Sequence, residues 1–106
     1  MSILTKDTIL AKLKNMQPVF EKEGVNLLGL FGSYSRDEAQ EDSDIDILIE
    51  TTPKFLEIHG GFRAYSKLAD LKVILENFFN KDVDFTDKQG LIDHNNTYIL
   101  KKAIHV

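Results

Sequence analysis

The sequence contains no cysteine, so the protein can form neither a disulfide nor a metal site built on thiolates. Histidine is scarce as well, because His59, His94 and His105 are scattered along the chain with no spacing that suits a zinc site. Any metal ion bound by this protein would therefore need oxygen ligands.

Long apolar runs are also missing. The sequence shows no stretch of roughly 18 apolar residues and no signal-like N-terminus, so we expect no membrane span and a cytoplasmic location. The formal net charge of −4 argues against a broad electrostatic grip on nucleic acid. We therefore expect no direct nucleic acid binding, and the charge favours a small ligand or a protein partner.

The composition that remains is typical of a folded protein. Hydrophobic residues make up 42% of the chain and charged residues 28%, and 106 residues suit one domain over residues 1–106.

The first part of the chain predicts a helix followed by a strand. Apolar residues at helical spacing follow a possible N-cap at Thr5, and Gly24 suits the end of this helix. Pro18 predicts a kink or a restart within it. Residues 25–31 are nearly all apolar and predict a buried strand.

Further helices and strands alternate along the rest of the chain. We expect a helix over 35–40 capped by Ser35, a strand over 43–50, a loop marked by Pro53 and Gly60-Gly61, a helix over 62–79, a strand over 83–86 and a helix over 91–102. Residues 103–106 could add an edge strand. On the helix over 62–79 one side carries Tyr65, Leu68, Leu71, Leu75 and Phe78. On the last helix we expect Leu91, Ile92, Ile99 and Leu100 to be buried.

Acidic residues alternate with apolar ones in the strand over 43–50. Asp44, Asp46, Leu48 and Glu50 share one face, while Ile45, Ile47 and Ile49 face a core. Carboxylates two residues apart lie roughly 6 to 7 Å apart and can converge on one hard cation, for which Mg²⁺ is the natural choice. The alternative is an ordinary polar face of a half-exposed strand. Asp42, Asp44 and Asp46 would stand at the first, third and fifth positions of a calcium-binding loop. Such a loop is excluded because its sixth position needs glycine and is occupied here by Ile47.

Gly32 and Ser33 precede this strand, at the end of the strand over 25–31. Glycine lets the backbone approach an anion closely, and a serine hydroxyl with amides at a helix start can hold phosphate oxygens. The alternative is ordinary turn chemistry. Neither a P-loop nor a dinucleotide-binding fingerprint occurs in the sequence, so any phosphate site would be of another type.

Gly32-Ser33, ten intervening residues and Asp44-Ile45-Asp46 form the pattern G-S, ten residues, D-x-D. The stretches "LFGS", "GSYSR" and "SDIDILI" carry it, and the chain resembles the minimal nucleotidyltransferases of the DNA polymerase beta-like superfamily through to its end. The resemblance implies an α/β (α+β) fold of the polymerase beta-like type, with a small mixed sheet of three to four strands flanked by helices.

The resemblance also implies a third carboxylate on a later strand, within a "VDL"-like motif. Val83-Asp84-Phe85 matches that motif, and Asp82 is the rival because it would share the same strand face. In the family roles, Asp44 and Asp46 would hold one or two Mg²⁺ ions that bridge the triphosphate of ATP, and Asp84 would share a metal ion and help deprotonate the attacking hydroxyl.

The phosphate-binding roles implied by the resemblance fall to Gly32 and Ser33, which would cradle the terminal phosphates, and to Arg36, which could contact phosphates. The alternative for Arg36 is an ion pair with Glu38 or Asp42. The residue after this arginine is usually glycine in the family but is Asp37 here, which adds a negative side chain near the expected phosphate site. Since the carboxylate set is complete, we expect an active enzyme.

Minimal family members are similar to antitoxins that are paired with a helical HEPN ribonuclease toxin and transfer AMP from ATP to a tyrosine of that toxin. The resemblance therefore implies a HEPN-type toxin as partner, because 106 residues leave no room for an added acceptor domain. Two alternatives stay open: an inactive binding module that blocks the toxin sterically, and a stand-alone transferase for a small hydroxyl compound.

Overall fold

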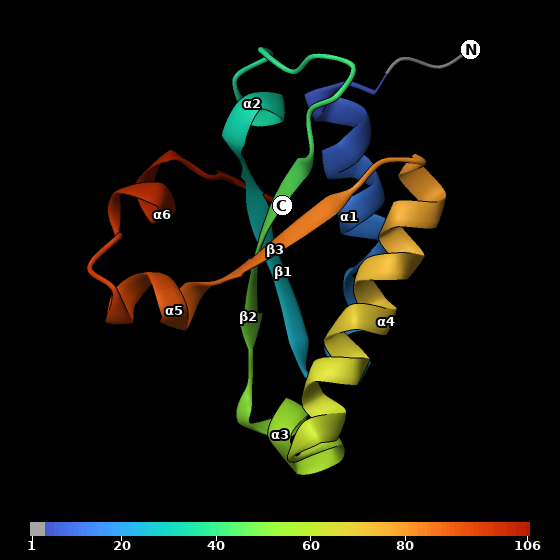
Figure 1. Ribbon diagram of the computed structural model, residues 1–106, viewed down its shortest axis with the longest axis vertical. Coiled ribbons are helices and arrows are strands. Elements are labelled where there is room, and N and C mark those ends of the chain that lie inside the picture. The colour runs from blue at the N-terminus through green and yellow to red at the C-terminus, as the bar shows by residue number, and fades with distance from the viewer. Residues whose placement is uncertain (1–3) are drawn as a thin grey trace.

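A mixed sheet of four strands forms the centre of the protein, as the computed structural model of residues 4–106 shows (Figure 1). The strands are β1 (Val25–Phe31), β2 (Ile45–Thr51), β3 (Val83–Asp87) and β4 (Ile104–His105), in the order β3-β2-β1-β4. β1 pairs antiparallel with both β2 and β4, whereas β2 and β3 run parallel. The predicted fold class, including the edge strand at the C-terminus, is confirmed.

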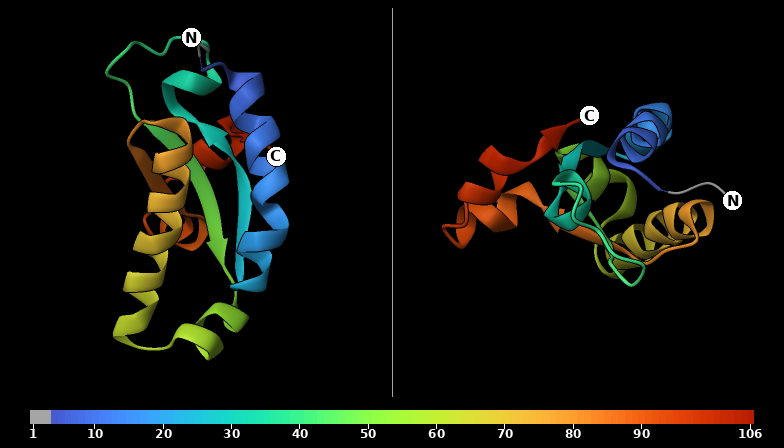
Figure 2. Two further views of the ribbon diagram at one scale, coloured as in Figure 1. Left: turned by 90° about the vertical axis from the view of Figure 1, so that its right-hand side faces the viewer. Right: turned by 90° about the horizontal axis from the view of Figure 1, so that it is seen from above.

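Helices cover both faces of this sheet. The helices are α1 (Lys6–Lys22), α2 (Gly32–Ser35), α3 (Pro53–His59), α4 (Phe62–Phe79), α5 (Lys88–Asp93) and α6 (Tyr98–Lys102). α1 and α4 lie on one face and α5 and α6 on the other (Figure 1 and Figure 2). Within residues 4–106, none of these helices has the length and apolar character needed to cross a membrane.

Two apolar clusters hold the layers together. The larger one joins side chains of α1 and α4 to the isoleucines of β2, which face this core as predicted; its members from these elements are Ile9, Leu13, Phe20, Leu71, Leu75, Phe79, Ile45, Ile47 and Ile49. On the other face Leu48 packs with Leu91 of α5 and with Ala103. The face of β2 that carries Asp46 is therefore polar at its start and buried further along.

The predicted start of α1 is confirmed. The side chain of Thr5 accepts a hydrogen bond from the backbone of Thr8, and the Thr8 hydroxyl accepts one from the backbone of Thr5, which is a complete capping box. The helix continues through Pro18 to Lys22, so the proline does not interrupt it.

Two local predictions in the first half of the chain are wrong. The helix expected over 35–40 is instead α2, which starts directly after β1 and ends at Ser35, whose hydroxyl donates to the carbonyl of Gly32 at 2.6 Å. The loop expected around Pro53 is α3, because proline at the first position of a helix has a suitable φ and loses no hydrogen bond there.

The second half also differs in detail. α4 has the predicted bounds, but its buried side is rotated relative to the expected one: Tyr65 is 78% and Phe78 is 57% exposed, while Phe79 is buried. The helix expected over 91–102 is divided into α5 and α6 by a turn in which Asn95 has a φ of +61°. Ile92 was expected to be buried and is 44% exposed.

Gly24 connects α1 to β1 and provides a test of this packing. Its φ is +84°, and a Cβ placed on it would lie 2.3 Å from the backbone nitrogen of Phe55. We expect Gly24→Ala to lower the free energy of unfolding by about 2 to 4 kcal/mol, from left-handed strain and overpacking.

The matched control is Gly90→Ala, because Gly90 lies inside α5 and a Cβ there has no neighbouring atom within 4 Å. This change should be neutral or stabilising by up to about 1 kcal/mol. Urea denaturation measures both variants. Equal stability of Gly24→Ala and the unchanged protein would contradict the predicted packing at this junction.

Candidate active site

The turn between β1 and α2 carries Gly32 and Ser33. Gly32 has a φ of +74°, which is in the left-handed region that favours glycine. A Cβ placed on Gly32 would lie 2.1 Å from Oδ2 of Asp46, far inside any allowed contact. Glycine is therefore required here both by the backbone conformation and by the carboxylate that lies against it.

Asp46 and Asp84 are neighbours across the sheet. The parallel register of β2 and β3 pairs Asp46 with Asp84, and on its other side β2 pairs Asp46 with Phe31, the residue before Gly32. Paired residues of adjacent strands project to the same face, so the two carboxylates share one face of the sheet. Asp44 lies just before β2, two residues from Asp46, and its side chain is exposed like that of Asp84.

The three aspartates interact electrostatically at Asp46. Burial raises the pKa of the Asp46 carboxyl above its usual range, and the negative charges of Asp84 and Asp44 raise this pKa further. The positive charge of Arg36 opposes this effect. The structure thus brings Asp44, Asp84 and Arg36 within electrostatic reach of Asp46, which lies against Gly32.

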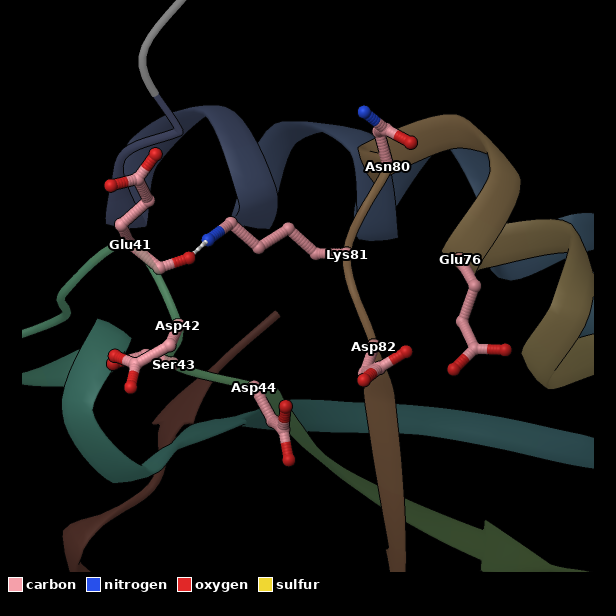
Figure 3. A pocket seen from close by; sticks show the side chains of 8 residues that line it. All are labelled: Glu41, Asp42, Ser43, Asp44, Glu76, Asn80, Lys81 and Asp82. Atoms are coloured by element: carbon pink, nitrogen blue, oxygen red, sulfur yellow. Dashed lines mark hydrogen bonds between the residues drawn. The ribbon is translucent and has the colours of Figure 1, made fainter.

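An acidic cleft of about 510 Å³ adjoins this group, between the loop before β2 and the connection from α4 to β3 (Figure 3). Asn80 ends α4 in the left-handed conformation, and β3 follows three residues later. The residues that line the cleft are Glu41, Asp42, Ser43, Asp44, Glu76, Asn80, Lys81 and Asp82. Five of these eight carry a carboxylate, so the cleft is strongly negative and suits cations.

Asp82, the rival of Asp84, lines this cleft together with Asp44. Its carbonyl oxygen accepts a hydrogen bond from the backbone of Ile45 at 2.9 Å, which ties the starts of the two strands together. The two candidates therefore occupy different places: Asp84 pairs with Asp46 within the sheet, and Asp82 lines the cleft, which Asp84 does not.

Residues that the sequence did not single out complete the cleft. A carboxylate oxygen of Glu76, on α4, accepts a hydrogen bond from the backbone of Val83 at 3.0 Å. The Nζ of Lys81 donates to the carbonyl oxygen of Glu41 and so connects the two walls (Figure 3). Helical periodicity places Glu76 on a helix but says nothing about the strand that this helix ends beside.

Arg36 makes the ion pair that was the alternative to a phosphate contact. Its Nε lies 3.2 Å from Oε2 of Glu38, and both side chains are more than half exposed. An exposed pair of this kind is worth about 1 kcal/mol or less, so it would not hold Arg36 away from a ligand. Ser33 lies beside Gly32 and is half-buried.

Asp37 explains why the resembling family usually has glycine at this position. Its φ is +56°, and the backbone nitrogens of Asp37 and Glu38 bond to the carbonyls of Tyr34 and Ser33 in the Schellman arrangement that ends many helices. Aspartate tolerates this left-handed conformation better than most residues. Its carboxylate lies 3.5 Å from Nζ of Lys6 on α1, and this lysine offsets the extra negative charge.

A hard divalent cation fits the donors of this site. Within residues 4–106, no three or more Asp, Glu or His side chains are arranged closely enough to hold a metal ion as they stand. The donors nevertheless suit one chemically, because carboxylate oxygens are the preferred ligands of Mg²⁺ and a bound cation would offset the repulsion that raises the pKa of Asp46. Asp44, Asp46 and Asp84 are the residues that would hold it.

Comparison with known proteins gives the same family over nearly the whole chain. Residues 8–106 match the nucleotidyltransferase domain model. The protein adenylyltransferase MntA of Thermococcus cleftensis is 34% identical over 107 residues, which cover 100% of both chains. A "Putative protein adenylyltransferase" of Methanocaldococcus jannaschii is 35% identical over 89 residues, covering 84% of this chain and 87% of the relative.

A solved structure agrees with these sequence relatives. "Structure of putative minimal nucleotidyltransferase" superposes with a TM-score of 0.75 at 27% sequence identity and covers 100% of both chains. Fold and sequence thus point to the same family.

The raised pKa of Asp46 predicts a pH-dependent gain from Asp46→Asn in metal-free protein. Because the folded state raises this pKa, ionised Asp46 destabilises the fold at neutral pH, and the penalty disappears as the pH falls and Asp46 binds its proton. Asp46→Asn should therefore raise the melting temperature at pH 7 in EDTA, and the gain should shrink as the pH is lowered towards 4.

Asp42→Asn is the control, because Asp42 is an exposed acid that lines the neighbouring cleft. It should change the melting temperature much less at either pH. A destabilised Asp46→Asn protein, or a gain that does not depend on pH, would show that the cost of burying an ionised Asp46 beside Asp84 and Asp44 has been misjudged.

Proposed function

This chain belongs to the nucleotidyltransferase domain family, in its minimal form, and on that basis we propose that it is a magnesium-dependent protein adenylyltransferase that acts as an antitoxin. Its substrates are ATP and a tyrosine hydroxyl of a cognate HEPN-type ribonuclease toxin. The reaction consumes ATP, so we place it in the cytoplasm.

The observation that supports this proposal most strongly is the position of Asp46. Its carboxylate lies against Gly32 of the G-S turn and is paired across the sheet with Asp84, while Asp44 lies two residues away. The turn that we propose binds phosphate and the carboxylates that we propose bind a cation are thus adjacent, which is what transfer of a phosphate-bound group requires.

The reaction is a substitution at the α-phosphorus of ATP. The tyrosine oxygen forms a new bond to the α-phosphorus, and the bond from that phosphorus to the oxygen bridging to the β-phosphate breaks. Pyrophosphate leaves with the electron pair, and the phenolic proton passes to a carboxylate, for which we propose Asp84. Magnesium bound by Asp44, Asp46 and Asp84 would supply positive charge against the phosphate oxygens.

The turn after β1 would hold the phosphates that leave. Gly32 has no side chain that would keep an oxygen away from its backbone, and the hydroxyl of Ser33 can donate to a phosphate. Arg36 is exposed and can exchange Glu38 for a phosphate oxygen at little cost.

Two relatives that align over most of their length are named protein adenylyltransferases, which supports a protein as acceptor. Adenylate attached to a tyrosine adds bulk and negative charge. Beside the RNA-cleaving residues of a toxin this charge would repel RNA phosphates and block the site.

Substitution of each rival aspartate tests the role of Asp84. If Asp84 receives the proton, Asp84→Asn should lower kcat at least a hundredfold with a much smaller change in the KM for ATP, because this role is realised mainly in the transition state. Asp82→Asn, the matched control in the lining of the cleft, should change kcat only a few-fold. Steady-state kinetics with both variants would reveal the reverse ranking if the motif has been misaligned.

The acceptor is tested by intact-mass spectrometry of a HEPN-type toxin encoded beside this gene. After incubation with ATP and Mg²⁺ we expect one added adenylate on a tyrosine, and the modified toxin should stay inactive on RNA after this protein is removed. Asp46→Asn should leave the toxin unmodified. Inhibition of an unmodified toxin, seen only while both proteins are bound, would favour steric blocking and contradict the proposed transfer.

A further inference from the structure

The strand β3, which carries Asp84, lies at an edge of the sheet. In the order β3-β2-β1-β4 one side of β3 pairs with β2, and its other side has no strand next to it within residues 4–106. Asp84 is the second residue of β3 and lies opposite Asp46. The first residues of an edge strand separate most readily from their neighbour, so the position of Asp84 depends on what fixes the start of β3.

The first residue of β3 turns its N–H away from β2. The carbonyl oxygen of Asp82 faces β2, where it accepts a hydrogen bond from the backbone of Ile45 at 2.9 Å. Backbone groups of successive strand residues alternate between the two sides of a strand, so the N–H of Val83 faces the open edge. Val83 has an exposed fraction of 0%, which keeps water from this N–H. A buried N–H without an acceptor is destabilising, so the protein has to supply one.

Glu76 of α4 supplies the acceptor. Its Oε2 accepts the hydrogen bond from the N–H of Val83 at 3.0 Å, and its side chain extends from α4 towards the start of β3 (Figure 3). Hydrogen bonds to a carboxylate are stronger than those between neutral groups, and partial burial of this pair strengthens the bond further. Glu76 thus fixes β3 from the side that β2 leaves open.

The backbone of Glu76 holds the connection that leads to β3. Its carbonyl oxygen accepts hydrogen bonds from the N–H of Asn80 and, at 3.4 Å, from the N–H of Lys81. Asn80 has a φ of +55°, the left-handed conformation in which many helices end. Asn80, Lys81 and Val83 are therefore all tied to Glu76, and Asp84 follows directly.

The alternative for Glu76 is a role as one more negative charge of the acidic cleft that it lines. The two roles need different parts of the side chain. Fixing β3 needs an acceptor oxygen at the right reach, whereas a purely electrostatic role needs the charge. Glutamine keeps the oxygen and the reach without the charge, and aspartate keeps the charge with a shorter reach.

We propose that Glu76 is a positioning residue for adenylate transfer, because its carboxylate fixes the start of β3 through the N–H of Val83 and so holds Asp84 opposite Asp46. This inference rests on the proposed function, in which Asp84 receives the proton. It gives Glu76 no contact with ATP or with the acceptor.

Hydrogen exchange of the Val83 amide, followed by NMR in EDTA, tests the contact without any reaction. We expect this amide to exchange about tenfold faster in Glu76→Asp and within about threefold of the unchanged protein in Glu76→Gln. The control is Asp70→Asn, because Asp70 is an exposed acid of α4 that does not line the cleft, and it should change the exchange less than about twofold. Exchange that is unchanged in Glu76→Asp would overturn the inference.

Steady-state kinetics of AMP transfer to the HEPN-type toxin test whether the contact acts through Asp84. Glu76→Asp should lower kcat about tenfold with a much smaller change in the KM for ATP, and Glu76→Gln should keep kcat within about threefold. In an Asp84→Asn background, Glu76→Asp should lower kcat further by less than about twofold, because the residue that Glu76 positions is already disabled. Circular dichroism confirms that each variant is folded.

The outcomes separate this inference from the proposed function. A larger loss of kcat in Glu76→Gln than in Glu76→Asp would show that charge is what matters and would overturn the positioning role while leaving the transfer intact. A tenfold loss that persists in the Asp84→Asn background would overturn it as well, because Glu76 would then act independently of Asp84. Full kcat in Asp84→Asn alone would reject the role of Asp84 in the proposed function, and the inference with it.

Discussion

The close contact between the Asp46 carboxylate and Gly32 is the constraint on which the rest of the site depends. It requires β1 and β2 to pair so that Phe31 lies opposite Asp46, and it requires the backbone to turn into α2 at a residue that has no side chain. The parallel pairing of β2 with β3 then brings Asp84 to the other side of Asp46. A shift of one residue in either register would move these carboxylates to the opposite face of the sheet.

The same arrangement concentrates negative charge, and the fold supports it in two ways. The isoleucines of β2 pack under α1 and α4 on the opposite face, so the strand is anchored without help from its acidic side chains. Hydrogen bonds then tie the cleft walls together, from Ile45 to the carbonyl of Asp82 and from Lys81 to the carbonyl of Glu41. The fold therefore holds these carboxylates close together despite their mutual repulsion, which a bound cation would offset.

The sequence predicted the parts of this site that depend on local pattern. Strand alternation located Asp44 and Asp46, and the G-S spacing located Gly32, because both signals lie within one stretch of chain. The start of α2 was misplaced because its first residue has a positive φ, which helix propensity does not describe. α3 was missed because proline was interpreted as a breaker although it is favoured in the first helical turn.

The remaining features depend on tertiary structure and could not be predicted from local pattern. Glu76 and Lys81 reach the cleft only because α4 ends beside the start of β2. The exposed position of Phe78 follows from the rotation of α4 on the core, which periodicity gives to within a residue or so.

Binding of a non-hydrolysable ATP analogue, measured by calorimetry with Mg²⁺ and with EDTA, tests most directly whether Asp46 is the centre of the site. The unchanged protein should bind the analogue at least tenfold more tightly with Mg²⁺, and Asp46→Asn should lose this dependence on Mg²⁺. If Asp46→Asn instead kept the full effect of Mg²⁺, Asp46 would not hold the cation, and the active site would have to lie elsewhere on the protein.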